Sequence, residues 1–161
     1  MGNNGGLENN NRQRVLKFNV KRNEWTRMPD LKLQRAVKHD CAFFKGGSKG
    51  DYVLVAGGVL HSTRTELYFV PSGESEIVGD LNVPRADLSL ASVESPKQTI
   101  FAIGGSSKWG TWEQFQQDPG LDTVEEWDDA SKTWKATTIK LKRPNKKPAS
   151  LAVPRDMICP K

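Results

Sequence analysis

Two short segments of this chain resemble each other, and their spacing constrains the fold more than any other feature of the sequence. Residues 52–58 read Tyr-Val-Leu-Val-Ala-Gly-Gly and residues 99–105 read Thr-Ile-Phe-Ala-Ile-Gly-Gly, so the glycine pairs lie 47 positions apart. Similarity at a fixed spacing of roughly 20 to 50 residues is typical of an architecture built from repeated units. The 161 residues therefore have room for only a few copies of one unit.

The rest of the unit is predicted to be β structure. Nearly every apolar segment is short, rich in Val, Ile, Phe and Tyr, and bounded by turn-forming residues, whereas helical periodicity is absent. Residues 15–20 and 24–28 read as a hairpin, and residues 52–56 read as a strand buried on both faces. Since hydrophobic residues make up only 36% of the chain, the core is expected to be small.

Each glycine pair is followed by a loop and a hairpin. The second copy has this hairpin at residues 123–136, and residues 18–25 match it without a preceding glycine pair. We therefore treat Trp25 and Trp134 as equivalent and predict that both are core residues, because a buried indole fills much of the space between two sheets.

Two further features complete the unit. The middle copy has no tryptophan, and we expect Ile77 or Val78 in its place. An arginine precedes the next first strand in each copy, at Arg35, Arg85 and Arg143.

This recurring order of apolar run, diglycine, aromatic hairpin and arginine resembles the kelch repeat, over about residues 14 to 159. The resemblance implies an all-β fold, a partial kelch-type β-propeller of four-stranded antiparallel blades, with residues 1–13 as a disordered tail. Residues 14–161 would form half a blade, two full blades and half a blade, the last opening at residues 148–158. Since propellers have roughly four to eight blades, the ring would be open or completed by oligomerisation.

Two explanations of an incomplete ring are open. Two copies of the chain can associate head to tail, each uniting its Phe18/Trp25 hairpin with residues 149–159 of the other in a shared blade. Alternatively, the chain is a fragment of a longer kelch protein whose strand edges are poorly protected.

The chain has few of the side chains that catalysis needs, with only two histidines, so we expect no enzymatic activity, no cofactor and no metal. His39, just before a strand, is interpreted as a structural hydrogen-bonding group, and His61, in a loop, as solvated. Cys41 and Cys159 lack zinc-ligand spacing and are interpreted as free thiols, although whether they pair stays open.

Charge and targeting features are weak. The net charge of +5 permits an acidic partner without requiring one. A basic cluster between two blades is expected to be a solvated loop or a contact for such a partner, and without interleaved aromatic residues we expect no nucleic acid there. It comprises Lys140, Lys142, Arg143, Lys146 and Lys147. The polar start of the sequence indicates no membrane contact and a cytoplasmic location, with secretion of a longer parent left open.

The candidate binding residues lie in loops. The insertion at residues 106–121 carries Trp109, Trp112 and Phe115 at a spacing of three, so they would line one side of a short helical turn. Such an aromatic face is typical of an interface hot spot, although it can equally cover an open blade edge. The other candidates are His61, Arg64, Arg35, Arg85 and Arg143.

The resemblance therefore favours a non-enzymatic protein–protein interaction scaffold, and family likeness suggests a cytoskeletal protein or a ubiquitin-ligase substrate as partner. The alternative is a small-ligand or carbohydrate binder, or an enzyme, at the propeller mouth. It would depend on Arg35, Arg85 and Arg143, which can equally be hydrogen-bond donors within the blades.

Overall fold

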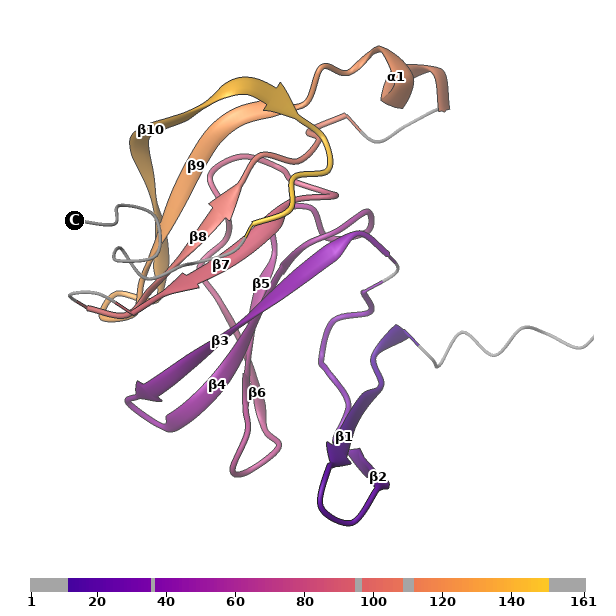
Figure 1. Cartoon of the computed structure of the whole chain (residues 1–161), viewed down its shortest axis with the longest axis vertical. Coiled ribbons are helices and arrows are strands. Elements are labelled where there is room, and N and C mark those ends of the chain that lie inside the picture. The colour runs from indigo at the N-terminus through magenta and orange to yellow at the C-terminus, as the bar shows by residue number, and fades with distance from the viewer. Residues whose placement is uncertain (1–11, 36, 95–96, 109–111, 151–161) are drawn as a thin grey trace, which may run out of the picture.

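A computed structural model describes residues 12–35, 37–94, 97–108 and 112–150, and it is all-β with antiparallel sheets, as predicted (Figure 1). An N-terminal hairpin pairs β1 (Val15–Asn19) with β2 (Glu24–Met28). The first sheet contains, in order, β3 (His39–Gly47), β4 (Gly50–Gly57), β5 (Thr65–Phe69) and β6 (Ser75–Val78). The second contains β7 (Ser89–Val93), β8 (Thr99–Ile103), β9 (Leu121–Asp128) and β10 (Thr133–Asn145), with α1 (Trp112–Gln117) between β8 and β9.

Both four-stranded sheets are meanders in which each strand pairs with the next one along the chain. In the view of Figure 1, the N-terminal hairpin and the second sheet lie on opposite sides of the first sheet. The two sheets contact each other through β3, β7 and β8.

The two glycine pairs occupy corresponding places at the ends of β4 and β8. All four glycines have positive φ, between 57° and 104°. A Cβ on Gly57 would lie 2.4 Å from the main-chain oxygen of Arg85, and one on Gly104 would lie 2.8 Å from that of Asn145. Both sites therefore require glycine for conformation and for space.

The main core lies between the two four-stranded sheets. Tyr52, Leu54 and Leu67 from the first sheet share one buried cluster with Ile100, Trp127 and Trp134 from the second. The prediction that residues 52–56 form a largely buried strand is confirmed.

Three side-chain hydrogen bonds made by Tyr52 and the two buried tryptophans cross this core and help to fix how the sheets pack. The indole Nε1 of Trp127 donates to the Tyr52 hydroxyl at 2.9 Å, and that hydroxyl donates to Asp129 at 2.7 Å. The indole of Trp134 donates to the Thr65 hydroxyl at 2.8 Å. Burial, with the hydrogen bond to Asp129, raises the pKa of Tyr52, so its hydroxyl stays protonated and able to donate.

The predicted burial of the two tryptophans is half right. Trp134 is buried in the core, but Trp25 is 67% exposed and contacts Phe18 with ring centroids 4.8 Å apart. Trp25 belongs to a two-stranded sheet, and no described residue covers the face that it shares with Phe18. The prediction for Trp25 was therefore wrong.

The register also corrects the middle copy. Phe18 pairs with Trp25 and Trp127 pairs with Trp134, and the corresponding pair in the first sheet is Tyr68 with Ser75. Ser75 therefore takes the tryptophan position, rather than Ile77 or Val78, because six residues separate the paired positions in all three hairpins.

Two predicted boundaries shift. Gln13 was assigned to a disordered tail, yet its side chain and main chain bind the main chain of Leu31 at 3.0 and 2.8 Å. Of that tail, residues 1–11 lie outside the described part of the chain, as do residues 151–158 of the predicted last strands. The basic cluster, interpreted as a loop, lies partly in β10, which continues to Asn145 by pairing with Leu121.

The Tyr52 hydroxyl provides a test of the interface. In Tyr52→Phe, the indole of Trp127 loses its acceptor, so we expect the free energy of unfolding in urea to fall by about 1 to 3 kcal/mol. Tyr68→Phe is the matched control, because the buried Tyr68 hydroxyl has no hydrogen-bond partner among the described residues. Equal losses in the two variants would contradict the assigned role of Tyr52.

Candidate functional site

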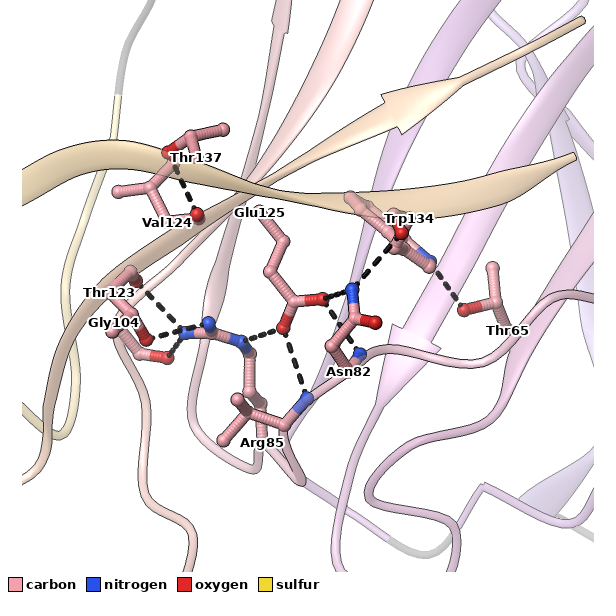
Figure 2. A network of polar contacts seen from close by, with 10 residues as sticks. Thr65, Asn82, Arg85, Gly104, Thr123, Val124, Glu125, Trp134 and Thr137 are labelled. Atoms are coloured by element: carbon pink, nitrogen blue, oxygen red, sulfur yellow. Dashed lines mark hydrogen bonds and ion pairs between the residues drawn. The ribbon is translucent and has the colours of Figure 1, made fainter. Parts of the chain in front are cut away.

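The buried guanidinium of Arg85 organises one end of the second sheet (Figure 2). Its Nη1 donates to the main-chain oxygens of Gly104 at 2.7 Å and Thr123 at 3.0 Å, and its Nη2 donates to the Thr123 hydroxyl at 2.8 Å. Its Nε donates to Glu125 at 3.0 Å. Arg85 thus joins the end of β8 to the start of β9.

Glu125 in turn holds the segment that leads into β7. Its carboxylate accepts the main-chain N–H groups of Asn82 at 2.7 Å and Val83 at 3.3 Å, together with the Asn82 side-chain amide at 2.8 Å. With Arg85, these donors satisfy a carboxylate that is almost fully buried.

The first sheet has a corresponding cluster around Arg35 and Glu66. Arg35 Nη1 donates to the main-chain oxygens of Gly57 and Arg64, both at 3.0 Å, and Nη2 lies 3.8 Å from Glu66. Glu66 accepts the main-chain N–H groups of Lys32 at 2.6 Å and Leu33 at 3.2 Å.

We call these two groups the Arg–Glu clusters. Burial lowers the pKa of both guanidinium groups, and the paired glutamates act in the opposite direction. Each cluster leaves two opposite charges inside the protein with main-chain partners on both sides, and this arrangement makes their burial tolerable.

The arginines of these clusters were predicted from the sequence, whereas the glutamates were not. A signal was present, since Glu66 and Glu125 stand at the same place in their units, two residues before the aromatic residues Tyr68 and Trp127. The segments 30–35 and 80–85 also both read Asp-Leu followed by Arg at the sixth position.

The grouping of Arg143 with Arg35 and Arg85 was wrong. At the junction after the first sheet, the main-chain oxygen of Arg85 accepts the N–H of Gly58 at 3.0 Å. At the junction after the second sheet, the main-chain oxygen of Asn145 accepts the N–H of Gly105 at 2.9 Å. Arg143 lies two residues earlier on β10 and is exposed. Asn145 thus stands where the other sheet junction has its arginine.

The loops that carry the other candidate residues leave from the two glycine pairs and therefore lie at the same end of the sheets. The connection between β4 and β5 is residues 58–64, and the connection between β8 and β9 is residues 104–120. His61 and Arg64 are both half-buried in the shorter one, where Arg64 forms a 3.4 Å ion pair with Asp80.

The longer connection is closed at its base. Asp118 is buried and accepts hydrogen bonds from the Ser106 hydroxyl and, at 3.0 Å, from the N–H of Gly120. Burial alone would raise the pKa of Asp118, but these bonds, with a further one from the N–H of Lys108, lower it. Ser106 also pairs with Ala86 through two main-chain bonds of 2.7 and 2.9 Å.

The predicted helical turn in this connection is confirmed as α1, which contains Trp112 and Phe115. Trp109 lies outside the described residues. Arg35 and Arg85, proposed as binding residues, are buried and occupied within the Arg–Glu clusters, so they are not available to a partner. Their alternative role as hydrogen-bond donors within the sheets is the one observed.

The remaining polar residues do not converge. Partial burial and the positive charge of Arg35 lower the pKa of His39 at the start of β3. Cys41 is exposed and has no disulfide partner among the described residues, and Cys159 lies outside them. Within the described ranges, no three His, Cys, Asp or Glu side chains are grouped to hold a metal ion, and no helix is long and apolar enough to cross a membrane.

Comparison of the sequence with models of known protein families found no match, and comparison with curated proteins found no significant match.

The Arg–Glu clusters can be tested by removing one charge. Glu125→Gln leaves Arg85 buried without its counter-charge, so we expect the free energy of unfolding to fall by about 3 to 5 kcal/mol. Glu74→Gln, at an exposed position between β5 and β6, is the control and should change stability by less than about 0.5 kcal/mol. Equal urea midpoints for the two variants would show that the cluster contributes little.

The closed base of the long connection predicts a response to acid. Because the pKa of Asp118 is lowered on folding, its contribution to stability is complete above the pKa of an unfolded aspartate, about 3.9, and is lost as pH falls below it. Ser106→Ala removes a donor, so this variant should be less stable than the parent at neutral pH and should lose less on acidification. Asp122→Asn, which removes an exposed ion pair with Lys140, is the control. The measurement is urea unfolding at several pH values. Equal losses of stability on acidification in the parent and in Ser106→Ala would contradict this account.

Proposed function

We propose that this chain is part of a kelch-like β-propeller and that it binds another protein through the loops at the diglycine end, without catalytic activity of its own. The observation that carries the proposal is the pair of Arg–Glu clusters. They hold the same end of both sheets through corresponding main-chain oxygens, while the connections that leave this end differ greatly in length.

The frame supports the propeller part of the proposal. Two four-stranded meanders with the same strand order pack face to face, and their glycine pairs and buried arginines occupy matching positions. The chain's own sequence adds the kelch-like order of apolar run, diglycine and aromatic hairpin.

The loops support the binding part. The β4–β5 connection has seven residues, 58–64, and the β8–β9 connection has seventeen, 104–120. Long connections on a rigid frame usually carry function. This one contains Trp109, Trp112 and Phe115, residue types that are enriched where protein partners bind most strongly.

The proposed contact residues are therefore these three aromatic residues together with His61 and Arg64 of the shorter connection. Arg143, exposed on β10, extends the surface toward an acidic partner. By likeness to kelch proteins, the partner is a cytoskeletal protein or a ubiquitin-ligase substrate. The alternative of a ligand site or an enzyme loses Arg35 and Arg85, two of the three arginines on which it depended, because main-chain oxygens and glutamates occupy them.

The double variant Trp109→Ala/Trp112→Ala tests the proposal. With the tagged chain as bait in a lysate of its source, the parent should retain a specific protein that the double variant loses, and the affinity for that protein should fall at least about 100-fold. The temperature of unfolding should remain nearly the same.

Ile139→Ala removes an exposed apolar side chain from β10 and is the matched control, which should retain the partner. A large loss of stability in the double variant would indicate instead that the aromatic residues cover a sheet edge. Equal capture by parent and double variant would overturn the proposed contact residues.

A further inference from the structure

The N-terminal hairpin and the β9–β10 hairpin have the same construction. Phe18 pairs with Trp25 as Trp127 pairs with Trp134. The turns have a left-handed residue at the same position, Asn23 with φ 53° and Lys132 with φ 55°. In both, the side chain that follows the first aromatic residue binds main-chain N–H groups of the turn, at Asn19 and at Asp128.

The two hairpins differ in what covers them. Trp127 and Trp134 are 2% and 5% exposed because they pack on the first sheet, whereas Phe18 and Trp25 are 41% and 67% exposed. Burying an aromatic pair of this size removes a large apolar area from water. The N-terminal hairpin therefore presents an apolar face that no described residue covers.

The second sheet has a receiving surface of the matching kind. Tyr52 and Leu54 lie five and three residues before Gly57, on the face of the first sheet that receives Trp127 and Trp134. Thr99 and Phe101 lie at the same distances before Gly104, and alternation along β8 turns them away from the first sheet, since Ile100 and Ala102 are in the core. A groove of about 530 Å³ opens there, lined also by Val93, Glu126 and Lys135.

One polar pair changes on both surfaces at once. The Tyr52 hydroxyl accepts the indole N–H of Trp127, but Thr99, at the place of Tyr52, donates its hydroxyl to the main-chain oxygen of Trp127 at 2.9 Å. Phe18, at the place of Trp127, has no N–H to donate. Phe18 therefore needs no hydrogen-bond acceptor from Thr99 when the hairpin lies in the groove.

The Arg–Glu cluster changes in the same coordinated way. Glu66 and Glu125 lie two residues before Tyr68 and Trp127, and Leu16 lies two residues before Phe18. Asn145 replaces the arginine of the last sheet junction. If the hairpin belongs to the sheet into which residues 145–150 lead, Leu16 takes the place of the glutamate and Asn145 takes the place of the arginine. Both charges are then absent from that sheet, so neither is buried without its partner.

Charge complementarity adds to this match. Arg27 lies on the exposed face of the hairpin, since it pairs with Leu16. Its Nη2 donates to both carboxylate oxygens of Asp30, at 2.9 and 2.8 Å, which leaves its Nη1 and Nε for a further carboxylate. Glu126 lines the groove, and no described residue forms an ion pair or hydrogen bond with its carboxylate.

We infer that a second copy of this chain places its Phe18/Trp25 face in the groove of the second sheet, and that the first copy does the same in return. Two identical contacts related by a two-fold axis then give a head-to-tail dimer, a closed ring of about six blades in which each hairpin completes a blade of the other copy. The inference rests on the proposed propeller architecture and is independent of the proposed binding partner.

The first test is the mass in solution, by light scattering at about 100 µM protein, where a dimer with micromolar affinity is nearly complete. We expect twice the chain mass of 17.9 kDa for the parent and the monomer mass for Trp25→Ala. Leu60→Ala changes an apolar residue that is 51% exposed and lies outside both surfaces; it is the control and should remain dimeric. A monomeric parent with a normal unfolding transition would overturn the dimer while leaving the protein-binding proposal intact.

A charge exchange tests which surfaces meet. Arg27→Glu and Glu126→Arg should each raise the dissociation constant at least about tenfold, and the double variant should recover most of the loss. Cross-linking of a mixture of ¹⁴N and ¹⁵N chains should join Lys21 of one copy to Lys97 or Lys135 of the other. A dimer whose links run only between two hairpins, or one without rescue in the double variant, would overturn the head-to-tail arrangement.

Discussion

Burial of a guanidinium and a carboxylate at the same end of each sheet is the interaction on which the rest of the structure depends. Arg85 binds the main chain where β8 ends and β9 begins, and Glu125 binds the main chain of the segment that leads into β7. One ion pair thus fixes three parts of the chain that are distant in sequence. A buried pair of this kind adds little net stability, but breaking it is costly, so it specifies one arrangement of the chain.

The packing between the sheets follows from this frame. With the diglycine ends held, alternation along the strands brings Tyr52 opposite Trp127 and Thr65 opposite Trp134, and each indole finds an acceptor. The bond between Asp118 and Ser106 shows how a long connection is closed where it leaves the sheet, so that its length and sequence can vary.

Several elements were predictable because their signals are local. Short apolar segments bounded by turn-forming residues predicted the strands, and the diglycines marked where β4 and β8 end. The spacing of Trp109, Trp112 and Phe115 indicated a helical turn, which the structure has as α1. The partners of the arginines were not predictable, because Glu66 and Glu125 are separated from Arg35 and Arg85 by 31 and 40 residues. Arg143 was misplaced because identity of residue type, rather than hydrogen bonding of the main chain, was used to align it.

The amino-acid sequence by itself determined the secondary structure and its recurrence, since apolar alternation, turn residues and paired glycines act over a few positions. Only the tertiary structure decided which residues at matching positions of the repeat also have matching environments. Trp25 and Trp134 occupy the same place in matching hairpins, yet one is exposed and the other buried, because burial depends on whether a neighbouring sheet is present to pack against. That neighbour is a property of the assembled fold, and no local pattern of residues encodes it.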